Sequence, residues 1–192
     1  DEPDVLPHTV SVPPEAFLPL TGQVGHAAKR TLSEINYICG LGVMVHDHGH
    51  GSVRATREGR ADIRYRWADE DVETLKRGIV LSARVLLAGG AKEVFASAHG
   101  ATRHDNVESL AAELARLPLR AFSLYSAHPM GTMMMGTDPD RFVLDSRARA
   151  HRMAGLYVAD ASIFPTSLGV NPQLTTMVMG TLIGQGILED LG

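Results

Sequence analysis

The hydrophobic pattern of this chain changes its period at Asp69, and that change most limits the fold. Before it, SVRATRE and ADIRYRW are short strand-like segments around a bend at Gly59. After it, apolar residues recur at helical spacing, namely Val72, Leu75, Ile79, Ala83 and Leu86. Acidic residues occupy the first turn of this predicted helix, and Gly89 and Gly90 end it. The pattern predicts antiparallel strands followed by a long helix.

The remaining segments complete a mixed α/β (α+β) prediction without repeated βαβ units. The proline-rich stretch up to about Arg30 predicts irregular structure, and INYICGLGVMVHD predicts a buried strand. A second helix is expected from Val107 to Leu117, with Asp105 and Glu108 at its start. GLYVADAS predicts a strand over 155–162, and NPQLTTMVMGTLIGQGILEDL predicts a final helix starting at Asn171 or Pro172.

Composition excludes several classes of protein. A net charge of −4 over 192 residues argues against nucleic acid or an anionic membrane surface as a partner. The longest apolar run, Met177–Leu188, is too short to span a bilayer. Because Cys39 is the single cysteine, no internal disulfide can form, and we expect a reducing, cytoplasmic location. The chain starts with Asp1, so we expect a processed product, a subunit or a fragment.

Three residues are candidates for chemistry, and each has a plain structural alternative. His128 can act as a general base near neutral pH, or it is an ordinary loop histidine. Asn171 can hold a substrate hydroxyl, or it caps the helix that follows. Asp160 follows an apolar segment where α/β folds often hold nucleotides, or it caps a local turn.

Read together, three segments resemble the C-terminal region of glucose–methanol–choline (GMC) oxidoreductases. These are SAHPMGTMMMG, GLYVADASIFPTSLG and VNPQLTTM, in that order. Within the family, the segments SAHPMGT and PTSLGVNP most resemble the long-chain alcohol oxidase branch. The resemblance implies an FAD-dependent enzyme that oxidises the CH–OH group of an alcohol, either an oxidase or a dehydrogenase.

The resemblance also implies roles for individual residues. His128 matches the active-site histidine, and Asn171 matches the position that helps to hold the substrate hydroxyl. Asp160 and Ala161 match the segment that meets the flavin nucleotide. Pro172 and Gln173 match the helix opening beside the flavin ring, where a helix N-terminus suits negative charge.

The sequence departs from the family pattern in two places. Met133 and Met134 follow Thr132 where family members often have Cys-Arg, which predicts changed packing. The GxGxxG motif that seats the FAD pyrophosphate occurs nowhere in the 192 residues. We therefore expect residues 1–150 to form the substrate domain with the His128 loop, and 151–192 to supply the C-terminal strand and helix of an FAD-binding domain. An N-terminal FAD-binding chain or segment is then the expected partner.

One further pattern competes with this interpretation. HDHGHG places His46, His48 and His50 at alternate positions, which would share one face of a regular strand and could bind a transition metal. Gly49 and Gly51 favour instead a turn with solvated histidines, and no metal site is expected. A non-catalytic accessory or structural module is the remaining alternative.

Overall fold

The computed structural model describes residues 4–192, except for the side chain of Pro14. The chain divides into two compact units. Unit 1 contains the chain up to Val45 together with Ala68–Tyr125, and unit 2 contains His46–Trp67 and Ser126–Gly192. Each unit has its own hydrophobic core, so each is described separately.

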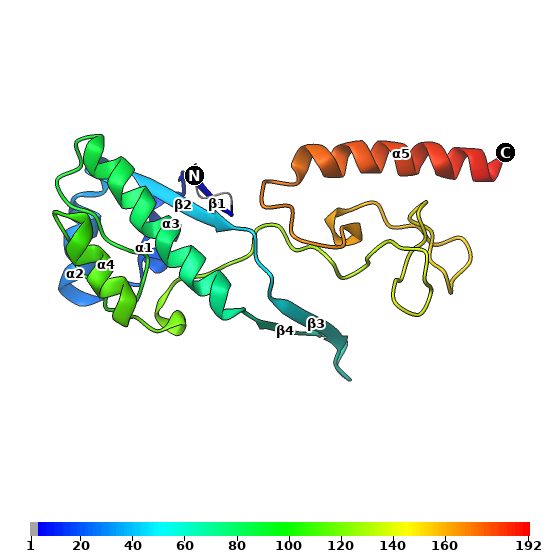
Figure 1. Ribbon diagram of the computed structural model, residues 1–192, viewed down its shortest axis with the longest axis horizontal. Helices are drawn as coiled ribbons and strands as arrows, with labels where there is room; N and C mark the ends of the chain where they lie inside the picture. The colour runs from blue at the N-terminus through cyan, green and yellow to red at the C-terminus, as the bar shows by residue number, and fades with distance from the viewer. Residues whose placement is uncertain (1–3) are drawn as a thin grey trace. The chain divides into compact units, whose positions relative to one another are not determined.

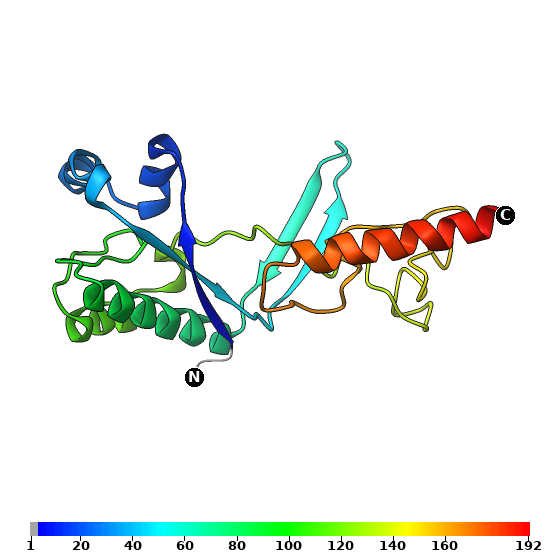
Figure 2. The ribbon, with the colours of Figure 1, turned by 90° about the horizontal axis from the view of Figure 1, so that it is seen from above.

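Unit 1 is built on a two-stranded antiparallel ribbon. Strand β1 (Val5–Val10) pairs with β2 (Gly40–Val45), with Val5 opposite Val45. Helix α3 (Asp69–Ala88) packs on this ribbon at Gly78, where any side chain would collide with those of Val5 and Val43. Figure 2 shows α1 (Pro14–Thr21) and α2 (Gly25–Ser33) on the other side of the ribbon from α3.

Helix α4 (Val107–Arg116) packs against α3 and closes the core of unit 1. The shared core consists of side chains from α3, from α4, from the loop between them and from the segment after α4: Ala83, Val94, Ala96, Ala98, Leu110, Leu114 and Phe122. Asn106 starts α4, because its side-chain oxygen accepts the N–H of Ser109 at 2.9 Å. The helix starts at Val107 as expected, but the expected cap at Asp105 is wrong by one residue, since the amide of Asn106 reaches the third helical N–H.

Unit 2 has fewer regular elements. Strands β3 (His50–Ala55) and β4 (Ala61–Arg66) form a separate antiparallel hairpin, and α5 (Gln173–Leu191) is the one long helix (Figure 1). Between the hairpin and α5, the described chain runs as loops with isolated bridges and one 3-10 turn, Ala161–Ile163. None of the described helices is both long and apolar enough to cross a bilayer.

The expected mixed fold with small antiparallel sheets is confirmed, but two expectations about its elements are wrong. The proline-rich start is not irregular over its described part, because Pro7 lies in an edge strand and Pro14 occupies the first turn of α1, both positions that tolerate proline. Pro3 lies outside the described residues. The strand expected over 155–162 is reduced to a bridge between Arg149 and Tyr157, because the following residues bend into a 3-10 turn.

Short 3-10 turns complete the description of unit 1. They cover Ile35–Tyr37, before β2, and Leu119–Ala121, after α4. The first of these lies inside the segment that was expected to be strand from Ile35 onward, so β2 is shorter than predicted. The helices expected from Asp69 and Val107 are confirmed.

Candidate active site

The His128 loop runs along the Asp160 turn and is hydrogen-bonded to it. The backbone N–H of Met133 donates to the carbonyl of Ser162 at 3.0 Å, and that of Met135 donates to the carbonyl of Ile163 at 3.2 Å. His128 itself is half-buried, and no hydrogen bond engages its imidazole within the described residues. Two segments that the sequence singled out separately are therefore neighbours.

Asp160 stabilises the turn on which it lies. One of its carboxylate oxygens accepts the N–H of Ser162 at 2.8 Å, and the carboxylate is exposed. Hydrogen bonding from the hydroxyl and the backbone N–H of Ser162 lowers the pKa of Asp160. The turn-capping role expected of this aspartate is therefore present, and a charged oxygen also faces solvent beside half-buried Ala161.

The final helix starts later than the sequence predicts. Helix α5 begins at Gln173, with Pro172 as its N-cap and no side-chain capping hydrogen bond. Pro172 is buried and its carbonyl accepts the N–H of Thr176 at 2.8 Å, while Asn171 and Gln173 are exposed. Asn171 is not the cap, because Pro172 holds that position, with φ of −81° and ψ of 2°. The amide of Asn171 is thus left for another contact.

A single hydrophobic core anchors all three segments. Its buried members are Leu144, Ala148, Ile163, Phe164 and Ile183. Side chains from the His128 loop and from α5 pack against it: Met130, Met133, Met135, Met179 and Ile187. The candidate residues His128, Asp160 and Asn171 therefore belong to segments that pack on the same hydrophobic core. That the side chains of His128 and Asn171 face each other across a substrate pocket stays a prediction.

The loop before the Asp160 turn is fastened to the far end of α5. The guanidinium of Arg147 donates to the carbonyl of Gly186 at 3.0 Å and lies 3.2 Å from Glu189. The hydroxyl of Tyr157 donates to Asp190 at 2.6 Å, and this hydrogen bond raises the pKa of Tyr157. None of these contacts was predicted, because arginines and acidic residues at this density give no pairing signal in sequence.

Ala148 holds an unusual backbone conformation in the same loop. It is the one non-glycine residue with positive φ, 59°, among the described residues, and it is fully buried in the core of unit 2. The carboxylate of Asp145 accepts the backbone N–H groups of Arg147 and Arg149 at 2.9 and 3.0 Å, which fixes the turn around Ala148. The tight turn thereby places the methyl group of Ala148 inside the core of unit 2.

The three histidines of HDHGHG do not share one face of a strand. Their ring nitrogens do not converge within the part of the chain that the structure describes, because only His50 belongs to the strand β3. His46 and His48 instead stack, with ring centroids 5.5 Å apart and planes 12° from parallel. The condition for a shared strand face is therefore not met.

Sequence reasoning missed that His46 lies near Gly169. A Cβ atom placed on Gly169 would lie 3.4 Å from Cβ and 3.6 Å from Nδ1 of His46. Gly169 has φ of +67°, a conformation that glycine adopts without strain. Two residues later comes Asn171, so His46 lies beside the turn that leads into the candidate site. The glycine was the only available signal, and a glycine alone does not name its neighbour.

The comparisons with known proteins point to one family. The family described as GMC oxidoreductase matches residues 47–180 of this chain through its C-terminal domain. A GMC-type oxidoreductase of Mycobacterium tuberculosis is 34% identical over 179 residues, which cover 93% of this chain and 28% of the relative. A long-chain-alcohol oxidase of Arabidopsis thaliana is 32% identical over 158 residues, covering 77% of this chain and 21% of the relative.

One further relative has a higher sequence identity over a shorter segment. Choline oxidase of Arthrobacter globiformis is 44% identical over 54 residues, which cover 28% of this chain and 10% of that enzyme. The chain spans about a quarter of the length of the first two relatives. The family match covers more than half of the chain and includes His128, Asp160 and Asn171. The chain therefore belongs to the GMC oxidoreductase family.

Proposed function

We propose that this chain supplies the substrate side of an FAD-dependent oxidoreductase that acts on the CH–OH group of an alcohol. The observation that carries the proposal is the common anchor of the three motif segments in unit 2. The His128 loop is hydrogen-bonded to the Asp160 turn, and α5 packs on the same core. Loops on a rigid base are where catalytic groups are usually found.

His128 is the proposed general base. Alcohol oxidation needs the hydroxyl proton removed as a hydride leaves carbon, and an imidazole nitrogen accepts a proton readily near neutral pH. His128 is half-buried on a loop, so its ring is accessible to a substrate. Asn171 is exposed and is not used as a helix cap, so its side-chain amide N–H can donate a hydrogen bond to the oxygen of the substrate hydroxyl, whose proton passes to His128.

The residues at the start of α5 fit a flavin. The helix starts without a side-chain cap, so its first N–H groups remain for an anionic or electron-rich ring edge. Asn171, Pro172 and Gln173 would lie beside the ring, and Asp160 and Ala161 would meet the nucleotide part. When bound, FAD accepts the hydride at its N5 atom. The chain's own residues bind and orient the alcohol and remove its proton.

The whole enzyme needs more than these residues. No GxGxxG motif occurs in the sequence, so we place the pyrophosphate site in an N-terminal FAD-binding chain or segment. In that assembly, residues 1–150 would form the substrate domain and 151–192 would complete the FAD-binding domain. The lone Cys39 favours the cytoplasm as its location.

A long-chain primary alcohol is the first substrate to test, because relatives carry the name long-chain-alcohol oxidase. The test is anaerobic reduction of the flavin in the intact protein, followed in its visible absorbance band. We expect bleaching by the alcohol and none by the alkane of the same chain length. A protein that holds FAD but is not reduced by any alcohol would favour the alternative of a non-catalytic module.

A further inference from the structure

Six of the eight methionines lie in the two segments that border the candidate site. They are Met130, Met133, Met134 and Met135 in the His128 loop, and Met177 and Met179 in α5. Oxidants convert the thioether of methionine into a polar sulfoxide, which disrupts apolar packing. The proposed chemistry uses none of these sulfur atoms, and their surroundings indicate a different role.

Four methionines contribute to the anchor of the His128 loop. These core methionines are the ones that pack against the buried core of unit 2: Met130, Met133, Met135 and Met179. All four are half-buried, so solvent and small oxidants reach part of each side chain. Met133 and Met135 also lie where backbone N–H groups join the loop to the Asp160 turn. Their side chains and their backbone therefore hold the same stretch of loop in place.

The other four methionines provide a comparison within the same chain. Met44, Met134, Met153 and Met177 do not contribute to this core in the part of the chain that the structure describes. Met134 is half-buried between two core methionines, whereas Met153 and Met177 are 61% and 62% exposed. Because oxidation follows exposure, Met153 and Met177 should react before the core methionines. Oxidation of the two sets can therefore be separated in time.

We infer that the core methionines are an oxidation-sensitive anchor of the His128 loop, and that hydrogen peroxide is the oxidant to which they respond. Each sulfur atom gives two electrons to the peroxide and takes one of its oxygen atoms, and the other oxygen leaves as water. A sulfoxide oxygen is costly to bury among apolar side chains, so the oxidised side chain leaves the core and releases the loop. Only the effect on turnover rests on the proposed function.

Two variants of the intact protein divide the eight methionines evenly, and leucine nearly conserves the volume of methionine. The core variant carries Met130→Leu, Met133→Leu, Met135→Leu and Met179→Leu. The control variant carries Met44→Leu, Met134→Leu, Met153→Leu and Met177→Leu. Exposed Cys39 stays in both, so its oxidation affects both equally. After treatment with peroxide, turnover of the alcohol should fall about tenfold in wild type and in the control variant, and stay unchanged in the core variant.

A second measurement uses the wild-type protein alone and does not depend on activity. Peptide mass spectrometry follows each sulfoxide, and amide hydrogen exchange follows the N–H groups of His128 and Gly131. Exchange should stay constant while Met153 and Met177 are oxidised, and should become faster when the core methionines follow. Unchanged exchange after oxidation of the core methionines, or equal sensitivity of the two variants, would overturn the inference. If the untreated protein oxidises no alcohol, the proposed function fails, and the exchange data still decide whether the anchor exists.

Discussion

Leu110 and Leu144 are equally inaccessible to solvent, at 1% and 0% exposed, but their surroundings differ. Leu110 lies in α4 and packs within the core of unit 1, where most partners belong to regular helices or the loops that join them. Leu144 lies in a loop of unit 2, where the core gathers loops and one face of α5. The core of unit 1 joins two helices, α3 and α4, with the loops around them, whereas the core of unit 2 joins loops to a single helix, α5. The candidate chemistry lies entirely in unit 2.

Replacing His128 is the strongest test that the chemistry lies in unit 2 and not in unit 1. His128→Ala should reduce alcohol turnover by about 10²- to 10⁴-fold, because the proton acceptor is lost, while flavin content and thermal stability stay unchanged. His26→Ala, an exposed histidine of α2 in unit 1, is the control and should retain full turnover. Steady-state rates with a long-chain alcohol provide the measurement. Near-normal turnover in His128→Ala would remove the assignment of the base.

The two buried leucines sharpen the comparison at the level of stability. Leu110→Ala and Leu144→Ala should each reduce the free energy of unfolding by about 2–5 kcal/mol, since both leave a cavity. Only Leu144→Ala should also lower turnover under conditions where the protein is still folded, because its core anchors the His128 loop. Chemical denaturation measures the free energy of unfolding. Turnover is measured at denaturant concentrations below the unfolding transition. Equal activity losses in both variants would contradict the division.

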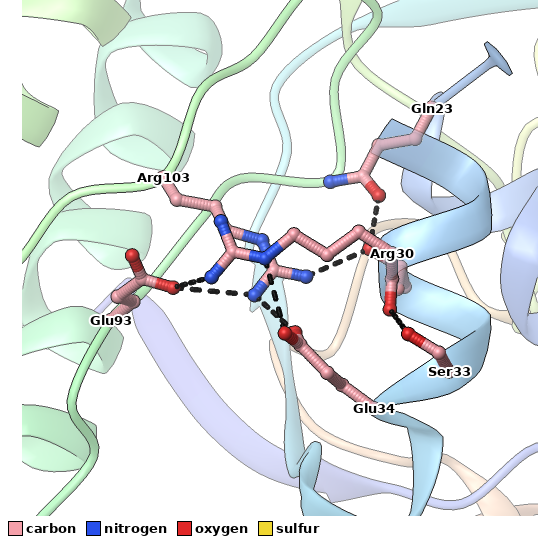
Figure 3. A network of polar contacts seen from close by, with 7 residues as sticks. Gln23, Arg30, Ser33, Glu34, Glu93 and Arg103 are labelled. Atoms are coloured by element: carbon pink, nitrogen blue, oxygen red, sulfur yellow. Dashed lines mark hydrogen bonds and ion pairs between the residues drawn. The ribbon is translucent and has the colours of Figure 1, made fainter. Parts of the chain in front are cut away.

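A polar network in unit 1 supplies the next prediction. Arg103 donates to Glu34 at 2.7 Å and to Thr31 at 3.0 Å, and its side chain is 15% exposed, compared with 52% for Arg30 (Figure 3). Arg103→Met should cost about 1–3 kcal/mol, because buried Thr31 loses a partner. Arg30→Met should cost less than Arg103→Met, since the ion pairs of Arg30 are solvated. Urea denaturation of both variants tests the order.

Two asparagines before helices separate stability from chemistry. Asn106→Ala should cost about 1 kcal/mol, because it removes the cap of α4, and should leave turnover unchanged. Asn171→Ala should lower turnover with little change in stability, because α5 has no side-chain cap. The comparison fails if Asn171→Ala destabilises the protein as much as Asn106→Ala does.

The smallest effect concerns acid stability in unit 1. Burial raises the pKa of Glu113, but hydrogen bonds from the hydroxyl and the backbone N–H of Thr102, together with the His104 imidazole 3.2 Å away, outweigh it, so the folded-state pKa is lowered. Glu113 therefore stabilises the fold above its unfolded pKa of about 4.3, and this contribution is lost as pH falls through the lower folded value. Glu113→Gln should be less stable than wild type at pH 7, and the difference should shrink in acid. Denaturation curves across pH would show a constant difference if the carboxylate has no such role.

Local patterns predicted the regular elements better than the site. The helices from Asp69 and Val107 and the hairpin around Gly59 were predictable, because apolar spacing and turn residues act over a few positions. The start of the chain was mispredicted, because proline signals irregular structure in general but is tolerated at strand edges and in first helical turns.

The site could be predicted only as a set of segments. Family motifs identified the His128 loop, the Asp160 turn and the start of α5 in sequence. Their common core, the clamp of Arg147 on α5 and the approach of His46 to Gly169 depend on contacts between distant parts of the chain. No short pattern carries such information. The start of α5 was misplaced because an asparagine before a proline looks like a cap.

The buried, left-handed Ala148 limits which residues the chain can accept at this position. Glycine would relieve a backbone penalty of about 1–2 kcal/mol but would empty the space of a methyl group, worth about 0.8 kcal/mol. Every larger residue keeps the penalty and must also displace the core around Leu144 and Ile163. In a saturation-mutagenesis library, position 148 should therefore tolerate alanine and glycine and reject nearly everything else, although it lies in a loop with no role in chemistry.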